Sequence, residues 1–328
     1  MARGITPPNA LPSYFPPGHQ THIQDWYENN FFKLHHAGIQ YLGTEPNLQH
    51  PDEFEKAKIR ILIVRLAPYD VVDGSYGMFQ VAEFCRQLKE DVFFDFCYFP
   101  YRDDLPKLIQ NNIPLMFGTI TKRPPTDFNI FAFSHSPINE RIHMPFVLAK
   151  SGIPVFRWER LSPDLPYNKN DKCPLVLLAG IGAAFTENLC SDSPIHGPAG
   201  NAIYDISLVG EGEGPFTNFL NLYQKIIIEE GKTKAELFKS MTNQNAMGFY
   251  DPSRYLFKYH DKIHTEIKSD GSKTETVWEQ GGGIKSIEAI DPDTNTIIPI
   301  ITPDSEEVRD LTKIQQAWVE NPPLLERS

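Results

Sequence analysis

A chain of 328 residues, of which 41% are hydrophobic and 22% charged, has a globular composition, suggests about two domains and is long enough to bury a large core. Its formal net charge of −11 at pH 7 argues against nucleic acids and anionic membrane surfaces as partners. No apolar run approaches the roughly 20 residues of a membrane-spanning helix, and the N-terminus lacks the basic and apolar regions of a secretory signal. We therefore expect a cytoplasmic protein.

Residues 1–57 are expected to form an irregular N-terminal arm. Proline recurs near the start, and aromatic and histidine side chains follow over residues 26–36. The segment Ile23–Leu42 is expected to hold one helix packed on the rest of the protein. His35 and His36 are adjacent and would face different sides of such a helix, so the pair does not predict a metal site.

Residues 58–231 alternate between apolar runs and segments with helical spacing. The runs are typical of parallel strands buried on both faces. A helix is expected over residues 78–88, a second one kinked at Pro145 and ending at Gly152, and a third from Phe216 onward. This order predicts an α/β fold, a doubly wound, flavodoxin-like (Rossmann-like) parallel sheet with helices on both faces. The expected strands are residues 59–67, 93–99, 129–134, 154–157, 175–179 and 205–209.

Residues 232–302 read as a small C-terminal extension that contains β-structure. A short helix is expected over Lys234–Met241. Alternating apolar residues predict a strand at Tyr255–Tyr259 and a hairpin around Asp270 and Gly271, with strands over 262–267 and 274–278. The charged, proline-bearing residues 303–328 are expected to be a linker or a docking tail.

Ligands of such a sheet bind at the carboxyl ends of its strands. The loops there are expected to converge on one cleft, where glycines let a ligand approach the backbone and hydroxyl groups bind its amides. The carboxylates of the segment Gly210–Gly214 repel phosphate and favour a hydroxyl-rich or amide-rich ligand, although a tight turn before a helix explains them equally well. The residues expected to bind the ligand are Tyr69, Ser75, Gly77, Ser134, Ser136, Gly180, Gly182, Gly210, Glu211 and Glu213.

The sequence contains no complete catalytic motif. Gly180-Ile181-Gly182 lacks the third glycine of a dinucleotide loop, because Phe185 stands there. In Ser134-His135-Ser136, adjacent side chains of an extended segment point in opposite directions, so a serine–histidine pair is poorly arranged. No P-loop and no Gly-x-Ser-x-Gly elbow occur. No catalytic residue is therefore predicted.

The four cysteines favour buried free thiols in a reducing compartment. No two of them form a Cys-x-x-Cys pair, and neither a disulfide nor an iron–sulfur cluster held by this chain is expected. They are Cys85, Cys97, Cys173 and Cys190.

Over residues 58–260 the order of segments resembles the N-terminal region of radical S-adenosylmethionine proteins that carry a cobalamin-binding-type domain. The most specific segment is the turn Gly210-Glu211-Gly212-Glu213 after a strand. The other segments that carry the resemblance are Ile59–Ala67, Ser75–Met78, Pro114-Leu115, Asp127–Ser134, Ala149–Val155, Pro174–Gly180, Asp205–Val209 and Met247–Ser253.

The resemblance implies cobalamin as a cofactor, with two departures. Asp-x-His-x-x-Gly, which would place a histidine under the cobalt, is absent, so cobalamin would lack a protein histidine ligand. Cys-x-x-x-Cys-x-x-Cys is also absent, so the iron–sulfur cluster and S-adenosylmethionine would belong to a barrel missing from this sequence or on a partner subunit.

Three functions follow from the resemblance. The first is an accessory, split or truncated module of a radical S-adenosylmethionine enzyme system. The second is a degenerate, non-catalytic structural or partner-binding protein, and the third is a flavin- or nucleotide-binding enzyme. The fold alone does not decide among them.

Overall fold

The computed structural model divides into two compact units, Met1–Pro252 and Ser253–Ser328. Residues 232–252, which the sequence grouped with the C-terminal extension, lie in the first unit. Among the residues described, no helix has the length and apolar character to cross a membrane. The structure describes residues 19–43, 49–72, 77–88, 91–134, 138–162, 173–179, 195, 200–208, 213–243, 249–251, 255–259, 262–267, 272–278, 284–290 and 297–301.

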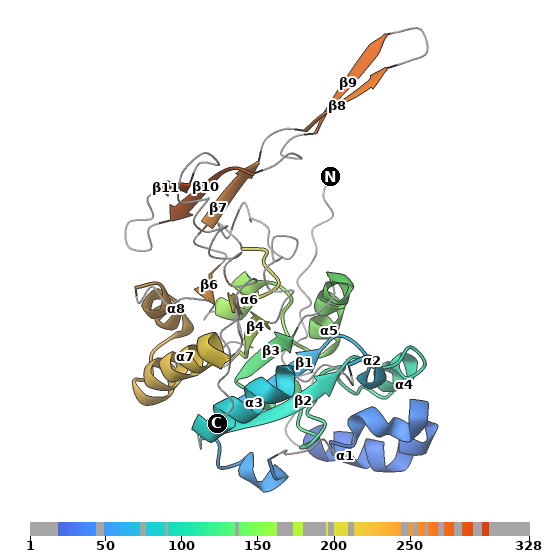
Figure 1. Ribbon diagram of the computed structural model, residues 1–328. Helices are drawn as coiled ribbons and strands as arrows, with labels where there is room; N and C mark the ends of the chain where they lie inside the picture. The colour runs from blue at the N-terminus through green and yellow to red at the C-terminus, as the bar shows by residue number, and fades with distance from the viewer. Residues whose placement is uncertain are drawn as a thin grey trace, which may run out of the picture. The chain divides into compact units, whose positions relative to one another are not determined.

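A six-stranded sheet forms the centre of the first unit (Figure 1). Its strand order is β2-β1-β3-β4-β5-β6, with the first five strands parallel and β6 antiparallel to β5. The predicted doubly wound α/β fold is thereby confirmed. The strands are β1 (Ile59–Arg65), β2 (Val92–Tyr98), β3 (Ile130–Ser134), β4 (Leu175–Ala179), β5 (Ile206–Leu208) and β6 (Phe249–Tyr250).

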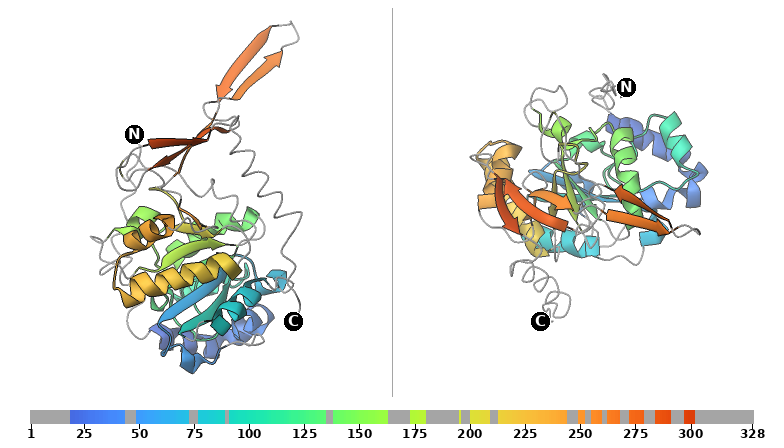
Figure 2. Two further views of the ribbon diagram at one scale, coloured as in Figure 1. Left: turned by 60° about the vertical axis from the view of Figure 1, so that its left-hand side comes forward. Right: turned by 90° about the horizontal axis from the view of Figure 1, so that it is seen from above.

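Helices cover both faces of this sheet, as the two views of Figure 2 show. The pleat of β1 sends Ile61 and Ile63 to one face and Leu62 and Val64 to the other, and each set belongs to a separate buried cluster. The first face packs against α3 (Gly77–Leu88), α7 (Glu213–Tyr223) and α8 (Lys234–Asn243). The second packs against α1 (His19–Asn30), α4 (Leu105–Gln110) and α5 (Met144–Lys150).

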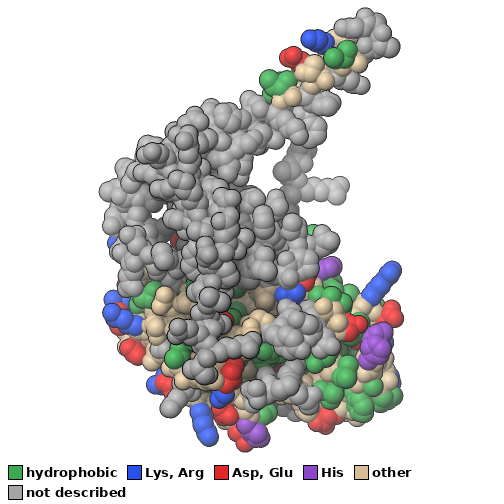
Figure 3. Space-filling view, viewed as in Figure 1, with side chains coloured by type: hydrophobic (Ala, Val, Ile, Leu, Met, Phe, Trp, Pro, Cys, Tyr) green, Lys and Arg blue, Asp and Glu red, His purple; other side chains and the backbone are tan. Residues whose placement is uncertain are grey.

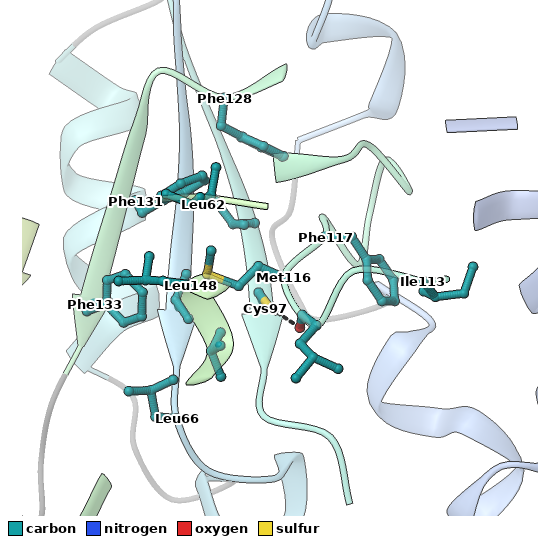
Figure 4. Packing of buried hydrophobic residues seen from close by; sticks show 14 of the residues in the cluster. Leu62, Leu66, Cys97, Ile113, Met116, Phe117, Phe128, Phe131, Phe133 and Leu148 are labelled. Atoms are coloured by element: carbon teal, nitrogen blue, oxygen red, sulfur yellow. Dashed lines mark hydrogen bonds between the residues drawn. The ribbon is translucent and has the colours of Figure 1, made fainter. Parts of the chain in front are cut away.

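The second face buries aromatic side chains of β2 and β3 (Figure 4). Phe131 and Phe133 of β3 meet Leu148 of α5, and Cys97 of β2 lies against Met116. Each of these side chains is at least nine-tenths buried. At about 25 cal/mol per Å² of apolar area removed from water, such packing is the main stabilising contribution to the unit.

Three local predictions were wrong. Residues 154–157 form no strand, because the carbonyl oxygens of Pro154 and Val155 accept hydrogen bonds from Arg160 of α6 (Arg157–Leu161) instead of from a neighbouring strand. Pro145 kinks no helix: it lies in the first turn of α5, where its missing N–H costs nothing, after the 3₁₀ segment η5 (Ile138–His143). The single helix over Ile23–Leu42 is replaced by α1 and two 3₁₀ segments, η1 (Phe31–Lys33) and η2 (His35–Tyr41).

Two further short elements belong to the first unit. The chain continues from α7 into the π-helix η9 (Gln224–Glu229). A single helical turn, α2 (Tyr69–Val72), follows β1. Two more 3₁₀ segments of the described residues are η3 (Pro51–Glu53) and η4 (Pro125–Asp127).

The outer strand β2 has backbone groups of its outward side occupied along part of its length. On β2, the Gln49 side chain donates to the Val92 carbonyl oxygen over 2.9 Å and accepts from the Phe94 N–H over 2.9 Å. One side-chain amide therefore takes the place of a residue of a neighbouring strand. At the opposite side, β6 pairs with β5 through Ser207–Tyr250 and Leu208–Phe249.

The second unit contains two antiparallel sheets. β10 (Ile284–Ile290) lies between β7 (Tyr255–Tyr259) and β11 (Ile297–Ile301). The predicted hairpin is present as β8 (Lys262–Ile267) and β9 (Lys273–Trp278), whose register runs from Lys262–Trp278 to Ile267–Lys273. The sequence analysis did not predict β10 or β11.

The described cysteines are free and buried, and their burial suppresses the thiolate that thiol reagents attack. Burial raises the pKa of the Cys85 thiol to about 11 and that of the Cys97 thiol to about 12. Cys190 lies outside the described residues. We expect a Cys190→Ser variant to react slowly with a thiol reagent at about pH 8 when native, and fast after unfolding in urea. Fast reaction of the native variant would contradict the described burial.

Candidate ligand-binding site

The strand order places a topological switch point at the carboxyl ends of β1 and β3. These strands are neighbours, yet the chain leaves β1 for α3 on one face and leaves β3 for α5 on the other. A sheet in which successive connections depart to opposite faces opens at this switch point, where ligands of doubly wound proteins bind. The candidate site is therefore this carboxyl edge.

A buried ion pair holds the two strand ends together. Arg65, the last residue of β1, donates from Nη1 to the carbonyl oxygen of Ser134 at the end of β3, over 3.2 Å. Its Nη2 donates to Glu140 Oε1 of η5, also over 3.2 Å. Both charged side chains are 6% exposed. Ser134, predicted as a site residue, thus lies at the switch point, while Arg65 and Glu140 were not predicted.

Tyr69 also lies at this edge, in α2 directly after β1. Its ring meets that of Tyr98 edge to face, with centroids 5.1 Å apart, so it is held against the end of β2. Its backbone N–H donates to Gln40 Oε1 of η2 over 3.4 Å. The predicted residue is therefore in contact with the N-terminal arm as well as with the sheet.

Gly77 is the first residue of α3 and Glu213 is the first residue of α7. Both helices pack on the first face of the sheet. A Cβ at Gly77 would meet no atom within 4 Å, so that position is open. Glu213 stands in the first turn of α7, where a carboxylate stabilises the helix dipole. Because α7 follows β5, Glu213 belongs to a strand end two positions away from Ser134.

The predicted residues Ser75, Ser136, Gly180, Gly182, Gly210 and Glu211 lie outside the described residues. Their place at the site stays a prediction. The described part of the site therefore comprises Tyr69, Gly77, Ser134 and Glu213 from the sequence analysis, together with the newly located Arg65, Glu140 and Gln40.

Cations at this edge face carboxylates. Arg65 is paired with Glu140, and Lys107 Nζ lies 3.1 Å from Oδ1 of the buried Asp104. Burial and the neighbouring carboxylate of Asp70 raise the pKa of Tyr101 to about 12, so this tyrosine is neutral at physiological pH. Paired charges and neutral hydroxyl groups favour an uncharged polar ligand over a phosphate.

Comparison with known families identifies the relatives of this arrangement. A family model described as the N-terminal region of radical SAM proteins, where SAM is S-adenosylmethionine, matches residues 84–252, which is just over half of the chain. The chain belongs to this family. The match includes β2 to β6 and the site residues Ser134, Glu140 and Glu213. The N-terminal arm and β1, with Gln40 and Arg65, precede the matched range of the radical SAM N-terminal family.

No significant match was found among curated proteins or among solved structures. The family and the geometry of the carboxyl edge are therefore the two findings from which the function of this radical SAM N-terminal family member is inferred.

Proposed function

We propose that the first unit is a cobalamin-binding-type module that acts with the barrel of a radical S-adenosylmethionine enzyme. Membership of the radical SAM N-terminal family supports the association with such enzymes. The observation that carries the ligand proposal is the switch point between β1 and β3, with Tyr69, Arg65 and Ser134 at the strand ends.

The residues at this edge fit the periphery of a corrin ring. The amide groups that surround such a ring need uncharged hydrogen-bonding partners, and the edge offers a serine hydroxyl, tyrosines and the Gln40 amide. Tyr69 and Ser134 would bind these amides, and Gly77 would leave room for the ring. The cofactor would supply a corrin-bound cobalt ion, without a histidine ligand in the Asp-x-His-x-x-Gly pattern, which the sequence lacks.

A leucine at Gly77 tests the proposal with little risk to the fold, because the added side chain meets no neighbouring atom at its Cβ. We expect Gly77→Leu to weaken hydroxocobalamin binding at least about tenfold, equivalent to about 1.4 kcal/mol. The matched control is Gln80→Leu, which adds the same side chain at an exposed position one turn further along α3. Visible absorption during titration, and cobalt retained after gel filtration, measure the binding.

Equal affinities of Gly77→Leu and the wild type would exclude this edge as the cobalamin site. No binding by the wild type would contradict the cobalamin proposal and favour the degenerate, partner-binding alternative. A parallel titration with flavin mononucleotide, followed by fluorescence quenching, tests the flavin alternative on the same three proteins.

A further inference from the structure

The N-terminal arm contains an unusual backbone turn directly before Gln40. In η2, His36, Ala37 and Gly38 are all left-handed, with φ of 46°, 52° and 66°. Residues other than glycine adopt this conformation rarely, and strained runs of this kind concentrate at functional sites. The hydroxyl of Tyr27 donates to the Gly38 carbonyl oxygen over 3.2 Å, which ties the turn to α1.

Immediately after this turn, the arm contacts the segment that follows β2. The Lys122 ammonium group donates to the Tyr41 carbonyl oxygen over 2.6 Å and to that of Thr119. Gly43 has φ of +68°, and a Cβ there would lie 2.5 Å from the Thr119 carbonyl oxygen, so the two backbones touch. Four hydrophobic side chains of the arm are exposed, namely Phe31, Phe32, Ile39 and Leu42, and Figure 3 shows hydrophobic side chains gathered at the lower right of this view. Residues 40–43, which we call the inner side of the arm, therefore have a fixed position against Tyr69 and the segment after β2.

Three buried polar atoms at this inner side make no well-formed hydrogen bond within the described part of the chain, although the Tyr41 hydroxyl lies beside the Gln40 side chain and the Tyr101 hydroxyl beside Asp70. They are Gln40 Nε2, Tyr41 Oη and Tyr101 Oη, on residues that are 1%, 2% and 9% exposed. The Gln40 amide is oriented by Tyr69, whose N–H occupies Oε1. Buried polar groups are almost always hydrogen-bonded, so three neighbouring exceptions require an explanation.

The three side chains lie close to one another. Gln40 and Tyr41 are consecutive, and burial raises the pKa of Tyr41 well above its usual value, with smaller increases from Asp104 and Tyr101 and an opposing decrease from the Gln40 side chain beside its hydroxyl. Tyr101 is itself held by the ring of His35, with centroids 4.1 Å apart, while the His35 N–H donates to Asp104 over 3.0 Å. The arm and the segment after β2 thus enclose one group of polar atoms.

We propose that Gln40, Tyr41 and Tyr101 form a polar recess that receives an uncharged, amide- or hydroxyl-bearing part of the ligand. The recess offers one amide N–H₂ and two hydroxyl groups, which match such a group in donors and acceptors. The carboxylates of Asp70 and Asp104 beside Tyr101 disfavour an anion. The identity of the ligand as cobalamin rests on the proposed function; the existence of the recess does not.

Stability measurements on two tyrosines distinguish a binding recess from a structural, water-filled one. Tyr27→Phe removes a hydroxyl with a protein partner and is expected to lower the melting temperature by about 2–4 °C. Tyr41→Phe removes a hydroxyl that lies beside Gln40 but makes no well-formed hydrogen bond, and is expected to leave the melting temperature unchanged or raise it. A loss with Tyr41→Phe as large as that with Tyr27→Phe would overturn the proposal.

Binding measurements then test what the recess does. Gln40→Leu and Tyr41→Phe are expected to weaken hydroxocobalamin binding at least about tenfold, while Tyr27→Phe and Gln80→Leu are not. Wild-type affinity in both recess variants would overturn the proposal even if cobalamin binds. If the wild type does not bind hydroxocobalamin, the proposed function fails, and the two melting temperatures alone decide whether the recess stands.

Discussion

Replacement of Arg160 by methionine is expected to lower the free energy of unfolding by about 3–5 kcal/mol, because it leaves a buried carboxylate without its partner. Arg160 is fully buried and donates to both carboxylate oxygens of Asp205, over 2.8 to 3.2 Å. It also donates to the carbonyl oxygens of Pro154, Val155 and Ile203. One guanidinium group thus connects the segment after α5 to the start of β5.

Urea unfolding followed by circular dichroism measures this loss. The control is Arg86→Met, which breaks an ion pair with Glu83 whose side chains are 40% and 31% exposed, and which should cost less than about 1 kcal/mol. The double variant Arg160→Met, Asp205→Leu should recover only part of the loss, because Asp205 also accepts from the Val176 N–H over 2.7 Å. Similar stabilities of Arg160→Met and Arg86→Met would contradict the prediction.

Asp95→Ala is expected to lower the free energy of unfolding by about 4 kcal/mol, because each buried donor that loses its acceptor costs about 1–3 kcal/mol. Asp95 lies within β2 and is fully buried. Its carboxylate accepts from the N–H groups of Phe96, Ile120 and Thr121 and from the Thr121 hydroxyl, over 2.6 to 3.0 Å. Asp95→Asn keeps the shape but offers one acceptor atom fewer, so we expect about half of the loss.

Asp95→Ala is also expected to loosen the N-terminal arm. Asp95 holds Thr121, and the next residue, Lys122, donates to the Tyr41 carbonyl oxygen of the arm. Amide hydrogen exchange over residues 35–43 should therefore be faster in Asp95→Ala than in Arg86→Met. Unchanged exchange, or a loss of stability below about 1 kcal/mol, would show that Asp95 does not anchor this segment.

Burial raises the pKa of Asp95 above its ordinary value of 3.8, despite the four hydrogen bonds that lower it. The native state therefore binds this proton at a higher pH than the unfolded chain does. The associated stability is present in acid and is lost as the pH rises from the ordinary value through the native pKa. Both Asp95 variants should lack this contribution, which urea unfolding at several pH values measures.

The sheet could be predicted from the sequence because buried parallel strands are continuous apolar runs. Leu175–Ala179 agrees residue for residue with β4, and the predicted 59–67 runs two residues past the end of β1. The same signal failed at residues 154–157, where the apolar run carries no information about its hydrogen-bond partner, Arg160. Strand β6, only two residues long, is too short for any periodicity.

The edge that carries the candidate site followed from the predicted topology, and Tyr69 and Ser134 lie at this edge as expected, while their part in ligand binding stays a prediction. Arg65 and Glu140 are 75 residues apart, and no local pattern indicates that they pair. Gln40 was missed for a different reason. Its position depends on three consecutive left-handed residues, two of which, His36 and Ala37, are not glycine, so no sequence signal announces the turn.

The Gln49 amide on β2 limits how this protein can associate with others. An uncovered outer strand is a template on which a strand of another chain can add, and it promotes aggregation in the same way. Gln49 already occupies the Val92 carbonyl oxygen and the Phe94 N–H, and β6 occupies β5 at the opposite side. A strand of a partner barrel therefore cannot add at these positions of β2, where recognition has to use side chains and loops of this unit instead.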